Sequence, residues 1–340
     1  MKKYVVYLFD GTTQDFKRDK VTDWSNIVRL HALLHKSAFA PGSKLLDFYG
    51  DGVGCRHGEL LLGSTLGWGL ERRLEEAYLD LGTQVALAMK NSDELKIYVF
   101  GFSRGAYEAR VFCELVASCG VPGGDGSYCE AYDHLRRHDV DSMHRAMRDG
   151  RYCPAPAIEF LGVFDTVKMT DVADDIDIGH LPGIVRHACH AMSYNERRAI
   201  FPLTRFAPNE PNVEEVWFLG SHTDIGGGYE TRGLADRSLE WMIEKVNKHG
   251  LPVIYGPIED DTANHAVRFN DSFSILQGIG GFCVRGKWQE LRETRTDDVF
   301  HWSVQDEREQ FAGIVPELPE ESMIAYTPRH EQLNTKGMIA

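Results

Sequence analysis

The residues with the clearest chemical potential in this sequence are Gly101, Ser103 and Gly105, which form the pattern G-x-S-x-G. A short apolar run precedes them at residues 97–100, and a helical pattern follows at residues 106–117. In a strand–turn–helix of this kind the glycines permit a sharp turn that lifts the serine hydroxyl above the sheet. The N-terminus of the helix then points N–H groups and the positive end of its dipole at the same place. We therefore predict a nucleophilic Ser103 rather than an ordinary glycine-rich turn.

A nucleophilic serine needs a base that takes its proton, and His222 is the histidine best placed for that role. The sequence holds 14 histidines, so position along the chain has to decide between them. His222 directly follows a predicted strand at residues 213–219 and precedes three consecutive glycines at residues 226–228. His301 is the alternative base, in a less regular part of the chain.

The base needs a carboxylate that orients it, and Asp165 stands at the end of a predicted strand at residues 158–164. The resulting chain order Ser…Asp…His is the order expected of α/β hydrolases. Asp224 is the competing acid, only two residues after His222. For Asp224 we expect a structural role, in which its side chain caps the glycine turn through a hydrogen bond.

Acyl transfer also needs two backbone N–H groups that face the developing negative oxygen. We expect one from Arg104, directly after the serine, and the other from Gly11 or Thr12, in the loop after the first predicted strand. Gly11 would permit a close backbone approach there. We expect Asp10 to order this loop, with a direct part in substrate positioning as the alternative.

Two other histidines could suggest a metal site, but the pattern around them favours packing. His187 and His190 are three residues apart on a helix predicted over residues 184–200. No carboxylate or third ligand accompanies them nearby, as a metal site would require. The sequence therefore predicts neither a metal ion nor an organic cofactor.

Two phosphate-related patterns are incomplete. Haloacid-dehalogenase-type phosphatases carry D-x-D-G-T after their first strand, with the first aspartate as nucleophile, and the corresponding residue here is Leu8. Glycine-rich stretches at residues 49–54 and 63–69 lack the Lys-Ser/Thr ending of a P-loop. Both phosphoryl-transfer interpretations are therefore set aside, and residues 50–69 are expected to form a glycine-rich wall beside the active site.

Strand and helix patterns alternate along the chain, which predicts a mostly parallel central sheet with helices on both faces, an α/β-hydrolase-like fold. Ligands bind at the carboxyl ends of the strands in such sheets, and Asp10, Ser103, Asp165 and His222 all follow strand ends. The predicted strands are at residues 4–9, 45–49, 95–100, 158–164 and 213–219, and the predicted helices at residues 26–35, 70–89, 106–117, 184–200 and 235–249.

The chain is expected to form a single domain over residues 1–340, with loop or helical insertions that form a cap. A polar, glycine-rich segment at residues 120–157 is the expected insertion. Residues 251–340 show an irregular, acidic pattern and are expected to pack on the core. Either residues 50–69 or the insertion should cover the serine with an apolar surface.

Composition excludes several classes of protein. The net charge of −14 argues against a nucleic-acid partner or a polybasic membrane anchor. No apolar window approaches the roughly 18 residues of a membrane span, and the apolar start ends at Asp10 without a cleavage site. Seven cysteines without a C-x-x-C pair fit reduced thiols. We therefore expect a cytoplasmic protein without stable membrane insertion, with non-classical export as the alternative, and an ester or lipid as its substrate.

Taken together, these motifs resemble a large family of bacterial and fungal α/β hydrolases that includes the phospholipase effectors of type VI secretion systems. The resemblance spans roughly residues 4–230 in the family's order. It implies that Ser103, Asp165 and His222 are the catalytic triad. The matching segments are residues 9–12 (FDGT), 49–54 (YGDGVG), 101–107 (GFSRGAY), 162–166 (GVFDT), 191–198 (AMSYNERR) and 222–229 (HTDIGGGY).

Two departures from the family bear on function. Asn195 stands where the family has an aspartate before Glu-Arg-Arg, which would alter a structural ion pair. The membrane-associating C-terminal module of the larger secreted effectors is not recognised in this sequence. The resemblance implies a serine hydrolase that cleaves carboxylic esters, most simply a phospholipase or lipase. The alternatives are an acyltransferase or peptidase with the same triad, or a catalytically silent binding module.

Overall fold

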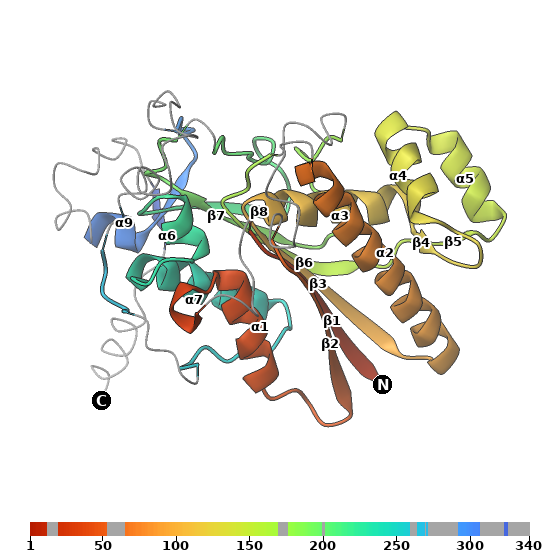
Figure 1. Ribbon diagram of the computed structural model, residues 1–340, viewed down its shortest axis with the longest axis horizontal. Helices are drawn as coiled ribbons and strands as arrows, with labels where there is room; N and C mark the ends of the chain where they lie inside the picture. The colour runs from red at the N-terminus through yellow and green to blue at the C-terminus, as the bar shows by residue number, and fades with distance from the viewer. Residues whose placement is uncertain are drawn as a thin grey trace, which may run out of the picture.

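An eight-stranded sheet forms the centre of the computed structural model (Figure 1). Its strand order is β10-β9-β8-β7-β6-β3-β1-β2, and every neighbouring pair is parallel. The structure describes residues 1–11, 20–52, 65–168, 176–198, 201–258, 264–268, 270, 292–306 and 323–325. The strands are β1 (Lys2–Phe9), β2 (Ser43–Gly50), β3 (Glu94–Phe102), β6 (Ile158–Phe164), β7 (Ala188–Ser193), β8 (Val213–Phe218), β9 (Val299–His301) and β10 (Met323–Ala325).

Helices cover both faces of this sheet, as the alternating pattern predicts (Figure 1). Side chains of β1 point alternately to opposite faces, so Tyr7 and Phe9 join a core under α2 and α3, whereas Val6 and Leu8 join a core under α1 and α7. The mostly parallel α/β fold is thereby confirmed. The helices are α1 (Asn26–Lys36), α2 (Thr65–Asn91), α3 (Arg104–Cys119), α4 (Tyr128–Arg137), α5 (Val140–Arg148), α6 (His222–Gly226), α7 (Gly233–Lys248) and α9 (Trp302–Asp306).

The prediction of a helix over residues 184–200 is wrong, because the chain forms strand β7 at Ala188–Ser193 instead. This strand lies between β6 and β8, and all six of its residues are buried. A strand buried on both faces shows a continuous apolar run without a period of two, and such a run cannot be separated from a buried helix by periodicity. His190 is therefore a strand residue, and His187 directly precedes the strand.

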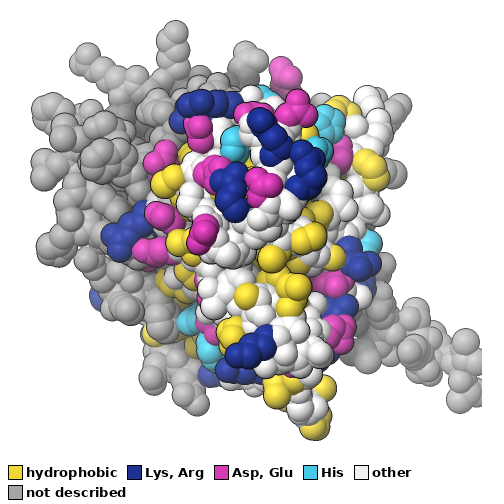
Figure 2. Space-filling model, turned by 90° about the vertical axis from the view of Figure 1, so that its right-hand side faces the viewer, with side chains coloured by type: hydrophobic (Ala, Val, Ile, Leu, Met, Phe, Trp, Pro, Cys, Tyr) yellow, Lys and Arg dark blue, Asp and Glu magenta, His cyan; other side chains and the backbone are white. Residues whose placement is uncertain are grey.

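The segment expected to be an insertion contains α4 and α5, together with the short strands β4 (Val121–Pro122) and β5 (Tyr152–Cys153). These elements pack at the C-terminal end of α3, where the thiol of Cys119 contacts the carbonyl oxygen of Ala131. Figure 1 shows α4 and α5 at the right edge of the molecule. Figure 2, which views that side, shows basic and acidic side chains intermixed, with hydrophobic side chains between them.

The described residues near the C-terminus extend the sheet. β9 pairs with β8, and β10 pairs with β9, so this part of residues 251–340 packs against the core. No helix among the described residues is long and apolar enough to cross a bilayer.

Candidate active site

Ser103 occupies a strained turn between β3 and α3. Its φ of 59° and ψ of −123° are unusual for a residue with a side chain. The turn needs glycine on both sides. A Cβ on Gly101 would lie 2.6 Å from the Cα of Ala106, and a Cβ on Gly105 would overlap the carbonyl oxygens of Phe9 and Asp10. This is the strand–turn–helix that the G-x-S-x-G pattern predicts.

The structure brings Ser103, His222 and Asp165 together from three separate strand ends. The Oγ of Ser103 lies 2.7 Å from Nε2 of His222, and Nδ1 of His222 lies 2.6 Å from Oδ2 of Asp165. All three residues are buried, with exposed fractions of 3% for Ser103 and His222 and 0% for Asp165. Both distances are within hydrogen-bond reach, which is the geometric requirement for a nucleophile, its base and the group that orients the base.

His222 is held by contacts on its backbone and its ring. It is the first residue of α6, and its backbone N–H donates to Oε2 of Glu196 at 3.0 Å. The ring of Phe201 stacks on the imidazole and that of Phe102 packs against it at a tilt, with centroid distances of 4.7 and 4.8 Å. Apolar rings around the imidazole keep water away from it and restrict its rotation.

Asp165 is a buried carboxylate with several donors. Its Oδ1 accepts from the backbone N–H of Ser193 at 2.8 Å. The guanidinium of Arg292 reaches both carboxylate oxygens, at 2.6 Å and 3.1 Å. Burial alone would raise the pKa of Asp165, but the charge of Arg292 and the hydrogen bond with His222 hold that pKa well below its usual range. The carboxylate is therefore ionised at neutral pH.

Asp10 lies at the carboxyl end of β1 and is almost fully buried. Its carboxylate accepts from the hydroxyl groups of Ser25 at 2.8 Å and Tyr49 at 2.7 Å, and from the N–H of Gly11 at 2.7 Å. These contacts fix the start of the loop that was expected to supply an oxyanion donor. Thr12, the alternative donor, lies outside the described residues.

Arg104 is the first residue of α3, next to the serine. Its backbone N–H is therefore one of the donors at a helix N-terminus that have no acceptor within the helix. Its side chain is half-buried, and burial together with the nearby charge of Arg73 lowers its pKa to about 10. The N-terminal turn of α3 approaches the end of β1 closely at Gly105, where an added Cβ would overlap the carbonyl oxygens of Phe9 and Asp10. A Cβ on Gly11 would lie 2.6 Å from the ring of Phe102, the residue before the serine, so the backbone of the β1 loop approaches that residue closely.

The two competing residues have other partners. Asp224 completes a capping box at the start of α6, because its Oδ2 accepts from the N–H and hydroxyl of Ser221, both at 2.9 Å. Burial raises the pKa of Asp224 to about 6. His301 stacks on Phe218 and places its Nδ1 2.8 Å from Oγ of Ser303. Neither residue takes the position that Asp165 or His222 occupies.

The histidines considered as metal ligands are engaged in packing and pairing. His190 places Nδ1 2.9 Å from Oε1 of Glu215 and accepts from the N–H of Thr166 through Nε2. The ring of His187 packs on that of His249, with centroids 3.9 Å apart. The contacts of His190 are those of a buried central strand, and the contact of His187 is ring packing just before that strand.

Asn195 accepts from the N–H of Gly220 at 2.9 Å and so ties the ends of β7 and β8 together. The adjacent Glu196 forms a two-contact ion pair with Arg198, at 2.6 and 2.8 Å. An ion pair is therefore present beside Asn195. This ion pair fixes the carboxylate of Glu196, which accepts the backbone N–H of His222.

Sequence reasoning missed Arg292 and the role of Glu196. Arg292 lies 127 residues after Asp165, in a region without a regular pattern, so no local signal connects the two. Glu196 stands in the N-E-R-R segment, but no local pattern in the sequence connects it to His222, whose N–H it accepts. Arg292 contacts Asp165, and Glu196 contacts His222, only because the fold brings separate segments together at the carboxyl edge of the sheet.

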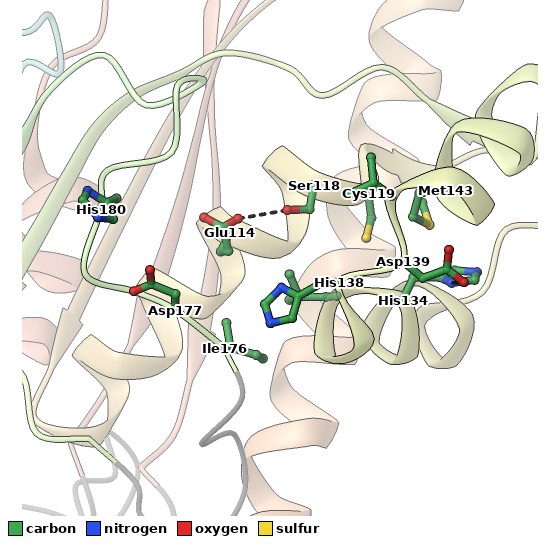
Figure 3. Close-up of a pocket in the computed structure, with 12 residues that line it drawn as sticks. Glu114, Ser118, Cys119, His134, His138, Asp139, Met143, Ile176, Asp177 and His180 are labelled. Carbon is green, nitrogen blue, oxygen red and sulfur yellow. Dashed lines mark hydrogen bonds and ion pairs between the residues drawn. The ribbon is translucent and has the colours of Figure 1, made fainter.

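A separate cavity of about 320 Å³ lies between the C-terminal part of α3 and the α4–α5 pair (Figure 3). Glu114, one of its lining residues, is 11 positions beyond Ser103, or about 16 Å along the helix. Thus α4 and α5 lie at the far end of α3 from the serine. Residues 53–64, in the other segment expected to cover the serine, are outside the described part of the chain.

Comparison with known proteins gives a family match. The model of the family described as the type VI secretion phospholipase effector Tle1-like catalytic domain matches residues 2–245. An uncharacterized protein of Saccharomyces cerevisiae, YEL023C, is 27% identical over 251 residues, which are 64% of this chain and 34% of that protein. The chain thus spans about a third of the length of this curated relative.

Solved structures show more distant likenesses. An uncharacterized protein from Pseudomonas aeruginosa is 20% identical, with a TM-score of 0.47, over 78% of this chain and 49% of the other. A Tle1 effector bound to the VgrG spike of the type 6 secretion system is 22% identical, with a TM-score of 0.42, over 67% of this chain and 51% of the other. The family match covers well over half of the chain, so the chain belongs to the family of Tle1-like phospholipase effectors, through their catalytic domain.

Proposed function

We propose that this protein hydrolyses carboxylic esters of lipids through an acyl-enzyme, with Ser103 as nucleophile, His222 as base and Asp165 as the residue that orients His222. The observation that carries the proposal is the chain of contacts from Asp165 to His222 at 2.6 Å and from His222 to Ser103 at 2.7 Å. The family supports the choice of substrate class, because its name describes phospholipases.

In the proposed reaction, Nε2 of His222 takes the proton of the Ser103 hydroxyl as Oγ attacks the ester carbonyl carbon. The tetrahedral intermediate collapses when the protonated His222 gives that proton to the leaving alcohol. A water molecule then attacks the acyl carbonyl and loses its proton to His222, which returns that proton to Oγ of Ser103 as the acyl–serine bond breaks and the acid is released. Asp165 stays ionised throughout and stabilises the positive charge that His222 carries in each transition state.

The oxyanion would be held by the N–H of Arg104 and by a second N–H from Gly11 or Thr12. The Gly11 N–H donates to the Asp10 carboxylate at 2.7 Å. If Gly11 is the second donor, this contact has to loosen when substrate binds. If it does not, Thr12 is the donor, and Asp10 acts by fixing the loop.

A fluorophosphonate probe followed by a panel of esters of increasing acyl length tests the proposal. The probe should label Ser103 stoichiometrically, and Ser103→Ala should abolish labelling and lower kcat by about 10⁴–10⁶-fold. Activity should rise with acyl length, because each buried methylene adds at most about 0.8 kcal/mol of favourable binding free energy. Labelling at another serine would remove Ser103 from its role.

The same panel separates the alternatives. Activity confined to amide bonds would indicate a peptidase, and transfer of the acyl group to an added alcohol in preference to water would indicate an acyltransferase. Labelling of Ser103 without turnover of any ester would favour the third alternative, a catalytically silent binding module. The proposed lipid substrate is supported only if esters with long acyl chains are hydrolysed faster than short ones.

A further inference from the structure

His31, His35 and Asp47 form a cluster of possible metal ligands outside the candidate triad. His31 and His35 are four residues apart on α1, so their side chains lie on the same face of the helix. Asp47 is on β2, the edge strand next to β1, and is the register partner of Val6, whose side chain packs in the core under α1. Helix and strand therefore direct the three side chains to one place.

The ligand atoms of this cluster are close enough to share one ion. Nε2 of His31 lies 2.8 Å and Nε2 of His35 lies 3.3 Å from the same oxygen, Oδ2 of Asp47. All three ligand atoms lie within 4.8 Å of one another. Zinc bonds of about 2.0–2.2 Å in a tetrahedral site separate neighbouring ligand atoms by roughly 3.3 Å. The His35 distance already fits, and the His31 contact would open by about half an ångström.

The chemistry of the group suits zinc. Two imidazoles and one carboxylate are a ligand set that borderline divalent cations prefer, and three protein ligands leave a fourth position for water. An aspartate is ordinarily ionised at neutral pH, as a ligand must be. The side chains of His31, His35 and Asp47 are 14%, 54% and 18% exposed, so an ion can reach them from solvent.

We infer that His31, His35 and Asp47 bind one Zn²⁺ ion, which clamps α1 to the edge strand β2. A carboxylate oxygen can accept hydrogen bonds from both imidazoles, but the same convergence of three ligand atoms within 4.8 Å of one another is also what one shared ion requires. An exposed ion pair of that kind adds little stability, whereas a shared ion gives each of the three groups a role.

The clamp lies near the loop that follows β1. Tyr49, two residues after Asp47, has its ring centroid 5.6 Å from that of His31 and donates to Asp10 at 2.7 Å. The ion itself would touch neither Ser103 nor its described partners, so its role is structural. This separation lets the site be tested without regard to the outcome for the proposed hydrolysis.

The test uses the full chain without a histidine tag, stripped of metal with a chelator and titrated with ZnCl₂ by calorimetry. We expect saturable binding of one ion per chain and a rise in Tm with zinc. Cobalt substitution should give the intense visible absorption of a four-coordinate site. Ser103→Ala should bind zinc as the unmodified chain does.

The variant His35→Ala changes a half-exposed residue and should fold. It should weaken zinc binding by more than the roughly 10–100-fold that loss of an outer partner costs. Asp47→Asn should weaken it as well, because the charge is lost. The matched control is His265→Ala, since His265 is 56% exposed and also pairs with an aspartate, Asp236, at 2.6 Å.

Binding that His35→Ala leaves unchanged, or that His265→Ala weakens equally, would overturn the assignment. So would the absence of saturable binding to the stripped chain when its Tm shows that it is folded.

Discussion

Asp165 is a buried carboxylate that faces His222 on one side and Arg292 on the other. Its φ of 41° is unusual for a residue with a side chain, and the chain holds it there through Ser193 and Arg292. Asp224 is also buried, yet it caps α6 and contacts no proposed catalytic group among the described residues. The two aspartates therefore offer a matched pair of substitutions.

Asp165→Asn should lower kcat by about 10⁴-fold, because an amide N–H facing Nδ1 favours the tautomer in which Nε2 carries the proton and cannot accept it from the serine. Asp224→Asn should leave kcat within about tenfold and lower the free energy of unfolding by about 0.5–2 kcal/mol through the lost cap. Kinetics and urea unfolding on both purified variants give the comparison. The reverse ranking of kcat would move the orienting role to Asp224.

At the level of elements, the described segment from Arg292 to Asp306 returns to the sheet edge and delivers a guanidinium to the carboxylate after β6. This segment lies beyond residues 2–245, which match the family model. Part of the electrostatic environment of the candidate site is therefore supplied from outside the matched region. Such a buried carboxylate is stable only while its charge is compensated.

Arg292→Met should destabilise the protein at neutral pH by about 3–5 kcal/mol, because it leaves the Asp165 charge without its partner. The folded-state pKa of Asp165 is depressed, so the stability from its ionisation is present above the unfolded pKa of about 3.9 and is lost as pH falls through the lower folded value. The difference in unfolding free energy between the two proteins should therefore shrink from pH 7 to pH 3.

Denaturant unfolding at several pH values measures this difference, with Arg292→Lys as the variant that keeps the charge but not the two-contact geometry. A difference that stays constant between pH 7 and pH 3 would show that Arg292 acts by packing alone.

The turn between β3 and α3 offers a second prediction at this scale. Gly105→Ala should lower the free energy of unfolding by about 1–3 kcal/mol or more, because the added Cβ overlaps the backbone of Phe9 and Asp10. Gly183→Ala is the control, since a Cβ there meets nothing within 4 Å. Equal stability of the two variants in thermal or urea unfolding would contradict the tight approach of α3 to β1.

For the whole molecule, the net charge of −14 sets how it meets a charged surface. A protein of this charge is repelled by anionic lipid, and salt screens the repulsion over a Debye length of about 8–10 Å. Hydrolysis of phosphatidylglycerol vesicles should therefore rise with ionic strength relative to phosphatidylcholine vesicles. A soluble short-chain ester, whose hydrolysis should not respond to salt, is the control. Equal salt dependence on both vesicle types would show that the net charge does not govern docking, and a fall on phosphatidylglycerol vesicles would indicate a locally cationic lipid-binding surface.

The sequence by itself determined the parts that depend on local pattern. The turn around Ser103 follows from two glycines between an apolar strand and a helix, and the parallel sheet follows from alternating strand and helix periods. Asp10, Ser103, Asp165 and His222 are predicted at strand ends for the same reason, since each stands within three residues of the end of a predicted strand. Their catalytic roles stay predictions until the variants above are measured.

Only the tertiary structure decided which distant residues meet. The helix expected over residues 184–200 is the central strand β7, because a run buried on both faces loses the period that distinguishes strand from helix. Arg292 reaches Asp165, and His35 reaches Asp47, through the packing of segments whose spacing in the sequence carries no signal. Local periodicity fixes the elements, whereas contacts between charged side chains depend on how the whole chain folds back on its sheet.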